Sequence, residues 1–263
     1  MAKIVAIANQ KGGVAKTTST YNIAAILSSQ GKNVLMVDLD PQSSLTISAG
    51  IEIENLQYTS KDLFNPEIEP AYCAITLKSL NDLENFYIIP ADISLSQMEL
   101  ELFTRTNRER QLKKALMKLD PYFDYIFIDC PPALGLLTLN ALVAANEVII
   151  PCTTELLAYR GMRYILATIK DIQKKENDLN PELKVAGVIA TRFKGALNDH
   201  KDILSLIRDL DVPFLGVIKD LSEAAKCVID GLPVVMAKPS CQVARAYYMV
   251  CDMAGYLDDK EVK

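Results

Sequence analysis

Short apolar runs, many of them β-branched, alternate along the chain with longer amphipathic stretches. Six of these runs predict buried strands, at residues 3–9, 33–40, 86–91, 124–130, 147–152 and 184–192. Five longer stretches carry helical spacing, at residues 18–31, 95–118, 136–146, 157–177 and 199–210. Near-continuous apolar strands separated by helices predict an α/β fold, in which a mostly parallel twisted sheet is covered by helices on both faces.

The regularity is interrupted between the second and third predicted strands. Residues 51–85 follow neither period clearly, and we expect an irregular excursion from the sheet there. The chain has no Gly/Ser-rich or Pro-rich linker and no internal repeat. Its 263 residues, half of them apolar, are enough to bury a large core, so we expect a single domain over residues 1–263.

Charge and cysteine content exclude some classes of protein. The formal net charge of −5 excludes a generally basic coat for nucleic acid but allows a local basic patch. The six cysteines form no C-x-x-C pair, so we expect buried thiols in a reducing compartment. The opening MAKIVAIANQ is too short for a signal sequence, and no apolar run is long enough to span a bilayer. These features favour a cytoplasmic protein.

The first predicted strand runs into a loop rich in glycine and lysine, NQKGGVAKTTST, at residues 9–20. The standard phosphate-loop pattern is G-x-x-x-x-G-K-[ST]. With its end placed at Lys16 and Thr17, it needs glycine at positions 10 and 15, where this chain has Gln10 and Ala15. The loop therefore joins a strand to a helix in the right order but departs from the standard pattern at two positions.

The chemistry of this loop nevertheless suits a phosphate group. Gly12 and Gly13 allow backbone N–H groups to turn toward an anion, and the next helix adds its N-terminal dipole. Lys16 can reach the β- and γ-phosphates of a nucleotide, and Thr17 can offer a hydroxyl group to Mg²⁺. A tight glycine turn before a capped helix is the alternative, but it leaves the lysine unexplained.

Acidic residues follow two of the predicted strands. Asp38 and Asp40 end the second strand in DLDPQ, and Asp129 ends the strand DYIFIDC. Because ligands bind at the carboxyl edge of open α/β sheets, we expect these acids to lie near the loop. A carboxylate at the tip of a buried strand can hold Mg²⁺, usually through its waters.

The loop and several later stretches carry motifs of a known family. QKGGVAKTT fits the deviant Walker A motif x-K-G-G-x-x-K-[ST], which requires neither missing glycine and contains a second lysine, Lys11. Together with VDLDPQSS, YIFIDCPPALGLLTLNAL and IPCTTELLAYRGM, it resembles the ParA/Soj family, ATPases that segregate plasmids and chromosomes. The resemblance runs from residue 3 to about 192 and implies the fold of a deviant Walker A P-loop NTPase.

The resemblance implies roles for the loop residues. Lys16 would bind the phosphates of ATP in its own subunit, and Lys11 would cross a dimer interface to the nucleotide of the other subunit. Thr17 would ligate Mg²⁺. The residues that would contact the nucleotide are Lys11, Gly12, Gly13, Val14, Ala15, Lys16, Thr17 and Thr18. Two ATP molecules would lie between two subunits, so that ATP favours the dimer and hydrolysis dissolves it.

The strand-end acids also receive roles from the resemblance. Asp40 would orient or activate the attacking water, which makes it catalytic together with Lys11 and Lys16. Asp129 would be the Walker B acid near Mg²⁺, and Asp38 would support the metal region.

Ala15 departs from close relatives, which usually carry glycine at this position. If the backbone there needs a positive φ, alanine adds strain of about 1 kcal/mol or more. We hypothesise that Ala15 leaves ATP binding intact and at most slows turnover.

The resemblance further implies non-specific DNA binding by the ATP dimer and stimulation of hydrolysis by a ParB-type partner. The loop begins near residue 10, which leaves no room for an N-terminal helix-turn-helix and argues against operator binding. The candidate DNA contacts are Lys219, Lys226 and Arg245, in the C-terminal helical region. Eight cations but also seven acids lie within residues 192–245, so a solvated surface of mixed charge stays an alternative.

A second basic cluster, residues 105–118, holds six positive charges against one negative charge. Apolar residues at positions 112, 115, 116 and 119 mark one buried helix face. We interpret the cluster as the charged outer face of a packed helix and as a candidate partner surface.

Two other functions stay open. A metal-cluster carrier or reductase of the nitrogenase iron-protein type would need paired cysteines across a dimer axis, and no cysteine here has a Gly-flanked or C-x-x-C context. The other is a MinD-like or other cargo-positioning ATPase on a membrane or protein matrix. On a membrane it would need a basic amphipathic C-terminal helix, whereas this chain ends in LDDKEVK.

Overall fold

The computed structural model describes residues 1–77, 83–219 and 222–258. In this part of the chain eight strands form one sheet, in the order β3-β4-β2-β5-β1-β6-β7-β8. Their bounds are β1 (Lys3–Ile7), β2 (Val34–Asp38), β3 (Ile75–Thr76), β4 (Phe86–Ile89), β5 (Tyr125–Asp129), β6 (Glu147–Thr153), β7 (Lys184–Thr191) and β8 (Phe214–Ile218). All neighbouring pairs are parallel except β3 with β4, which confirms the predicted, mostly parallel sheet.

Helices follow most of the strands. They are α1 (Lys16–Ser29), α2 (Ser44–Ser48), α3 (Leu95–Leu102), α4 (Gln111–Leu119), α5 (Leu136–Ala144), α6 (Leu156–Gln173), α7 (Asn198–Arg208), α8 (Ser222–Cys227), α9 (Val234–Ala237) and α10 (Gln242–Met253). Short 3₁₀ turns connect them, at η1 (Ile53–Asn55), η2 (Ser60–Phe64), η3 (Pro70–Cys73), η4 (Arg108–Arg110), η5 (Asp120–Tyr122), η6 (Lys175–Asn177) and η7 (Val228–Asp230). Among the residues described, no helix is long and apolar enough to cross a bilayer.

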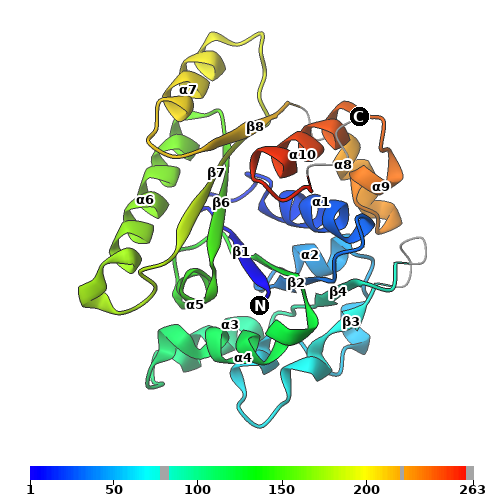
Figure 1. The fold of residues 1–263 in the computed structure, drawn as a ribbon, viewed down its shortest axis with the longest axis vertical. Coiled ribbons are helices and arrows are strands. Elements are labelled where there is room, and N and C mark those ends of the chain that lie inside the picture. The colour runs from blue at the N-terminus through cyan, green and yellow to red at the C-terminus, as the bar shows by residue number, and fades with distance from the viewer. Residues whose placement is uncertain (78–82, 220–221, 259–263) are drawn as a thin grey trace.

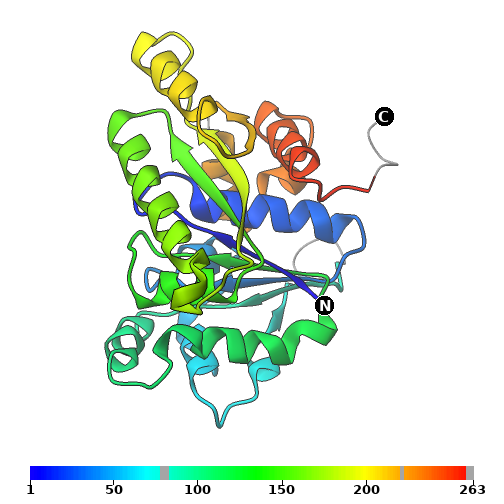
Figure 2. The same ribbon diagram turned by 60° about the vertical axis from the view of Figure 1, so that its left-hand side comes forward.

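Two hydrophobic cores lie on the two faces of the sheet. One core combines alternate strand residues with the apolar faces of α3, α4, α5, α6 and α7. The other combines the remaining strand residues with α1, α2, α8, α9 and α10. Figures 1 and 2 show the sheet running between these two helical layers, as predicted. Alternation along strands buried on both faces explains why each strand is apolar throughout.

The helix α1 is enclosed almost completely. Ile23 to Leu27 have no exposed surface, and three polar residues of the helix are held by hydrogen bonds to the C-terminal segment. Ser19 Oγ lies 3.2 Å from the Tyr247 hydroxyl, and the Tyr21 hydroxyl donates to the Gly231 carbonyl at 2.7 Å. Asn22 Oδ1 accepts from the backbone N–H of Val235 at 3.1 Å. The element that begins at the phosphate loop is therefore covered by the end of the chain.

One helix prediction was wrong. The expected helix over 95–118 is two helices, α3 and α4, separated by turns. The interruption includes Asn107, whose φ of 50° is left-handed and cannot continue a right-handed helix. The residues predicted to form the buried face of α4 are buried, namely Leu112, Ala115, Leu116 and Leu119.

The basic cluster at 105–118 serves mainly local structure. The guanidinium group of Arg105 donates to the Phe64 carbonyl, and Arg108 pairs with Glu109. Two longer-range ion pairs join Arg110 to Asp178, at 2.8 Å, and Lys118 to Glu69, at 3.3 Å. These pairs favour the interpretation of a charged outer face.

The described residues of the region 51–85 are irregular, as predicted, and contain three 3₁₀ turns followed by β3, while positions 78–82 of this region lie outside the described residues. The two-residue strand β3 was not predicted. The cysteine prediction is confirmed for five thiols, which are buried, whereas Cys241 is half-buried at the start of α10.

Candidate functional site

The phosphate-loop candidate lies at the carboxyl end of β1, between the neighbouring strands β5 and β6 (Figure 1). Gly13 has a φ of 72° and Ala15 a φ of 71°, so the chain turns twice through the left-handed region before α1 begins. The hydroxyl of Thr191, at the end of β7, donates to the Val14 carbonyl at 3.0 Å and holds the turn in place. The first N–H groups of α1 thus face the loop with no partners within the helix.

Backbone strain was expected at Ala15 if its φ were positive, and its φ is positive. A left-handed alanine is disfavoured by roughly 1–2 kcal/mol relative to glycine. Gly13 has the same conformation, and a Cβ atom added there would meet nothing within 4 Å. The two positions therefore form a matched pair, in which only the backbone preference differs.

We expect Ala15→Gly to leave stability unchanged or raise it by up to about 1 kcal/mol, since relief of strain is partly offset by the freer unfolded chain. Gly13→Ala should lower stability by about 1 kcal/mol, because it adds the same strain in open space. Urea unfolding of both variants measures the difference. Much tighter ATP binding by Ala15→Gly would contradict the view that alanine leaves binding intact.

Lys16 begins α1 and is buried, with 7% of its surface exposed. Its ammonium group lies 3.4 Å from the Lys11 carbonyl oxygen, across the loop. Burial lowers the pKa of Lys16, and the carboxyl groups of Asp129 and Asp40 oppose that shift. A buried ammonium enclosed by its own loop is a strong attractor for an anion such as phosphate.

Asp129, at the end of β5, is fully buried and faces the start of α1. The Thr17 hydroxyl donates to one carboxyl oxygen at 2.6 Å, and the Thr20 hydroxyl donates to the other at 3.2 Å. Burial raises the pKa of Asp129, and the nearby Asp38 carboxyl raises it further. A buried carboxylate beside a hydroxyl group is an oxygen donor set of the kind that suits Mg²⁺, whose charge would compensate the carboxylate.

Asp38 and Asp129 are paired in register on β2 and β5, which confirms that the strand ends bring the acids together. Asp38 accepts from the backbone N–H of Asp40 at 3.1 Å and from Thr46 through both its N–H, at 2.9 Å, and its hydroxyl, at 2.7 Å. Burial raises the pKa of Asp38, and the Thr46 hydrogen bonds oppose the rise. Asp38 thereby fixes the turn that presents Asp40, which is only 9% exposed.

Thr46 connects this turn to the next strand, because its hydroxyl also accepts from the backbone N–H of Ala91 at 2.9 Å. Thr46→Val should destabilise the protein by about 2–3 kcal/mol, since it leaves a buried N–H unpaired and removes a hydrogen bond to a buried carboxyl. Thr46→Ser keeps the hydroxyl and should lose only about 1 kcal/mol through the missing methyl group. Equal losses in urea unfolding would show that the hydroxyl is unimportant.

Lys11 lies outside the buried part of the loop. Its ammonium group forms an ion pair with Glu155, at the start of α6, and Glu155 also accepts from the Thr153 hydroxyl at 3.3 Å. The Lys11 N–H donates to Asn9 Oδ1 at 3.1 Å, and the Asn9 amide donates to the Pro151 carbonyl at 2.7 Å. Within one subunit the second lysine is therefore directed to β6 and α6, away from its own loop centre.

The sequence did not identify Thr20, Thr46 and Glu155 as part of this network. Thr20 follows Lys16 by one helical turn, a spacing that could have revealed it beside Thr17. Thr46 and Glu155 contact residues that are distant in the sequence, so no local sequence pattern predicts these contacts.

The three candidate DNA contacts lie on one exposed surface. Lys219 follows β8, Lys226 lies on α8 and Arg245 on α10. Lys219 and Arg245 line a common cavity of 340 Å³ together with Glu223, which pairs with Lys226 at 3.3 Å. The structure thus brings the predicted cations together, but around an acid.

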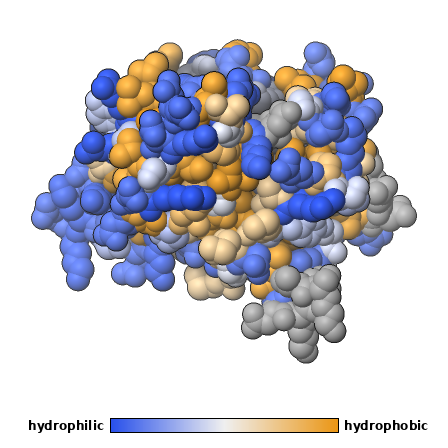
Figure 3. All heavy atoms as spheres, turned by 90° about the horizontal axis from the view of Figure 1, so that it is seen from above, coloured by the Kyte–Doolittle hydropathy of each residue, from blue (hydrophilic) through white to orange (hydrophobic). Residues whose placement is uncertain are grey.

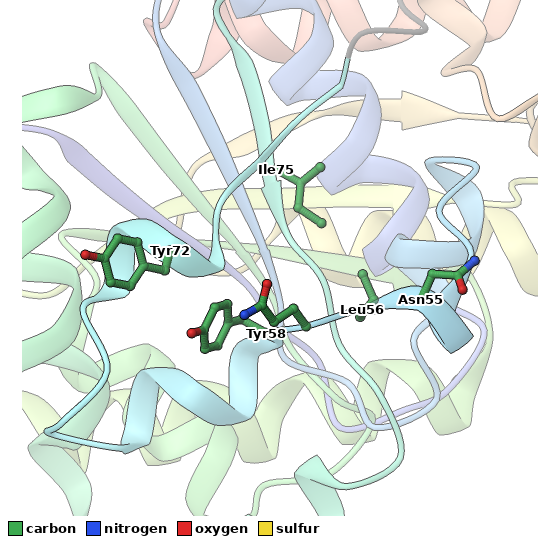
Figure 4. Close-up of a pocket in the computed structure, with 6 residues that line it drawn as sticks. Asn55, Leu56, Tyr58, Tyr72 and Ile75 are labelled. Carbon is green, nitrogen blue, oxygen red and sulfur yellow. The ribbon is translucent and has the colours of Figure 1, made fainter.

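Of two further cavities, one borders the phosphate loop and the other does not. One of 720 Å³ borders the loop helix at Thr18 and is also lined by Arg192, Phe193 and Lys219. Another of 510 Å³ lies beside β3, where Figure 4 shows Tyr58, Tyr72 and Ile75 around it. None of its lining residues is a predicted site residue, so the candidate site is the loop and its adjoining cavity.

The fold, the twice-turned loop and the buried lysine and aspartate define a P-loop nucleotide-binding protein. The sequence matches the AAA domain family (AAA_31) over residues 2–185. It is 36% identical over 249 residues to the sporulation initiation inhibitor protein Soj of Bacillus subtilis, covering 94% of this chain and 96% of that protein. It is 35% identical over 249 residues to the chromosome-partitioning ATPase Soj of Treponema pallidum, covering 94% of each chain.

A solved structure agrees with this assignment of the fold. It is titled as cobyrinic acid a,c-diamide synthase from Mycobacterium smegmatis with a bound ATP analogue and magnesium, is 38% identical and has a TM-score of 0.80. The match covers 94% of this chain and 91% of that one. The chain belongs to the ParA/Soj family of ATPases.

Proposed function

We propose that this chain is an ATP-dependent partition ATPase that dimerises, binds DNA non-specifically and positions or segregates plasmid or chromosomal DNA. The observation that carries the proposal is the loop, in which a left-handed turn leads into the uncapped start of α1 at the buried Lys16. The Treponema pallidum relative, the chromosome-partitioning ATPase Soj, supports a function in partitioning. The proposal includes Mg²⁺-dependent hydrolysis, slow without a ParB-type partner, by residues 1–263 acting as a single domain in the cytoplasm, on the nucleoid.

In this proposal each part of the loop has one task. Lys16 and the backbone N–H groups from Gly12 to Thr18 hold the β- and γ-phosphates of ATP. Asp40 accepts a hydrogen bond from the attacking water and orients it toward the γ-phosphate. Lys11 of the other subunit contributes positive charge where negative charge develops during hydrolysis.

Mg²⁺ would neutralise phosphate charge between the β- and γ-groups when it is bound. Thr17 and Asp129 are the residues that would hold it, directly or through water, because both are oxygen donors at the same point of the sheet edge. Asp38 supports them by fixing the neighbouring turn.

A second copy of this chain is the partner that the surface around Lys11 favours. Leu156 and Leu197 are about half exposed, and both line a cavity of 820 Å³ with Glu155. Viewed from above the orientation of Figure 1, hydrophobic residues gather in the middle of the surface between hydrophilic ones (Figure 3). An apolar face beside the Lys11–Glu155 ion pair suits an interface that closes around nucleotide.

Light scattering tests the proposal directly. The mass should double with Mg²⁺ and a non-hydrolysable ATP analogue but not with ADP, and the dimer alone should then bind duplex DNA of arbitrary sequence. A dimer that ignores DNA but sediments with liposomes would favour a MinD-like function on a membrane. A chain that stays monomeric would contradict the nucleotide sandwich.

A metal-cluster carrier is the remaining alternative from the sequence. It predicts iron and visible absorption in the purified protein, whereas the partition ATPase predicts neither. The absorption spectrum and an iron assay separate the two.

A further inference from the structure

The surface formed by α8, α9 and α10 places four cations around one carboxylate. Glu223 Oε1 lies 3.3 Å from the ammonium group of Lys226, and Glu223 Oε2 accepts from that of Lys238. Lys219 and Arg245 line the 340 Å³ cavity that Glu223 also lines. Both oxygens of a single carboxylate are therefore committed to lysines.

The arrangement joins separate elements and is not confined to one helix. Lys226 follows Glu223 by one turn of α8, whereas Lys238 comes from the end of α9. Arg245, on α10, donates from Nε at 3.0 Å and from Nη2 at 2.7 Å to the Ser240 carbonyl, which fixes the direction of its guanidinium group. Lys226, Lys238 and Arg245 are thus held at defined places on one surface, and Lys219 lines the adjoining cavity.

The carboxylate occupies the same donors that a phosphate would use. A phosphate oxygen and a carboxylate oxygen compete for one lysine ammonium, because both are anionic acceptors of short hydrogen bonds. An ion pair that is exposed to water is weak, so a phosphate can displace it, but at the expense of that pair.

We propose that Glu223 competes with the sugar-phosphate backbone of DNA for Lys226 and Lys238 and so weakens the DNA affinity of this surface. The inference rests on the proposed function, since it assumes that the ATP-bound dimer uses these cations for DNA. The inference adds that one residue, Glu223, lowers the affinity of this surface for DNA. When DNA binds to this surface, fewer counterions are released than if all four cations were free of the carboxylate. The bound dimers therefore dissociate from DNA more readily.

The test is the affinity of Glu223→Gln for duplex DNA of arbitrary sequence. Fluorescence anisotropy is measured on the protein with Mg²⁺ and a non-hydrolysable ATP analogue, over a series of salt concentrations. We expect binding to tighten about 3- to 20-fold, which corresponds to the loss of two exposed ion pairs. The plot of log affinity against log salt should steepen by about one to two units, one for each lysine made available.

Asp230→Asn is the matched control. Asp230 lies on the adjacent turn η7, is exposed, and forms no ion pair among the described residues. Its substitution removes the same charge without releasing a lysine, so affinity should change less than about two-fold. If both variants bind DNA more tightly by the same factor, Glu223 acts only through the net charge of the surface, and the inference is overturned.

Three outcomes separate the inference from the function on which it rests. Tightening confined to Glu223→Gln supports both. Wild-type binding that Glu223→Gln leaves unchanged overturns the inference alone. If neither protein binds DNA while light scattering still shows the ATP-analogue dimer, DNA binding itself is wrong and the inference falls with it.

Discussion

Lys16→Ala should lose ATP binding by at least about 100-fold. Each charge-assisted hydrogen bond to phosphate is worth about 1.5–3 kcal/mol, and one ammonium group can donate several. Because Lys16 is buried within its loop, no other described cation is placed to replace it there. Titration calorimetry with Mg²⁺ and a non-hydrolysable ATP analogue measures the effect. Unchanged affinity would remove the loop from phosphate binding.

Lys11→Ala is the control, because it removes the same charge from the same loop. Lys11 pairs with Glu155 and points away from the loop centre of its own subunit. The variant should therefore bind nucleotide as a monomer with affinity close to that of the wild type, but should not double its mass with ATP. If both lysine variants lose nucleotide binding equally, it is wrong that Lys16 acts on the nucleotide of its own subunit and Lys11 on that of the other subunit.

Asp40→Ala should bind ATP and form the dimer but hydrolyse ATP at least about 100-fold more slowly, within the range for loss of a group that orients or activates water. The turn that presents Asp40 is held by Asp38, so the substitution should leave the phosphate loop unchanged. Phosphate release under saturating ATP and light scattering on the same sample measure the two properties. Normal turnover would remove Asp40 from the catalytic role.

Asp40→Asn refines this result. One Asp40 oxygen accepts from the backbone N–H of Gln42 at 3.0 Å, and asparagine can retain that hydrogen bond. Loss of hydrolysis in both variants would show that the charge of Asp40 is needed. Retained hydrolysis in Asp40→Asn alone would show that position matters more than charge.

Much of the site could be predicted because its residues follow local rules. The glycines and Lys16 lie between a buried strand and a helix, a context that can be identified from neighbouring residues alone. The register of Asp38 with Asp129 followed from a parallel sheet, in which strand ends meet at one edge. The strain at Ala15 was also foreseen, since only a positive φ distinguishes alanine from glycine there.

Other features depend on contacts that the sequence order conceals. Glu155 meets Lys11 from 144 positions away, and Thr46 holds Asp38 through a turn that only the folded chain forms. The break before α4 depends on a left-handed Asn107 in a polar stretch with helical charge spacing. The candidate DNA cations could be listed, but their common neighbour Glu223 became visible only when α8, α9 and α10 were placed together.

The burial of α1 beneath the last part of the chain has a consequence for biosynthesis. Three of its polar residues, Ser19, Tyr21 and Asn22, are hydrogen-bonded to the C-terminal segment, at Tyr247, Gly231 and Val235 respectively, whereas α1 follows the first strand. A ribosome-bound chain that lacks this segment leaves the apolar surface of α1 in water. We therefore expect a nascent chain to acquire its nucleotide site only after residues 231–247 have left the ribosome, and until then to depend on chaperones that shield exposed hydrophobic surface.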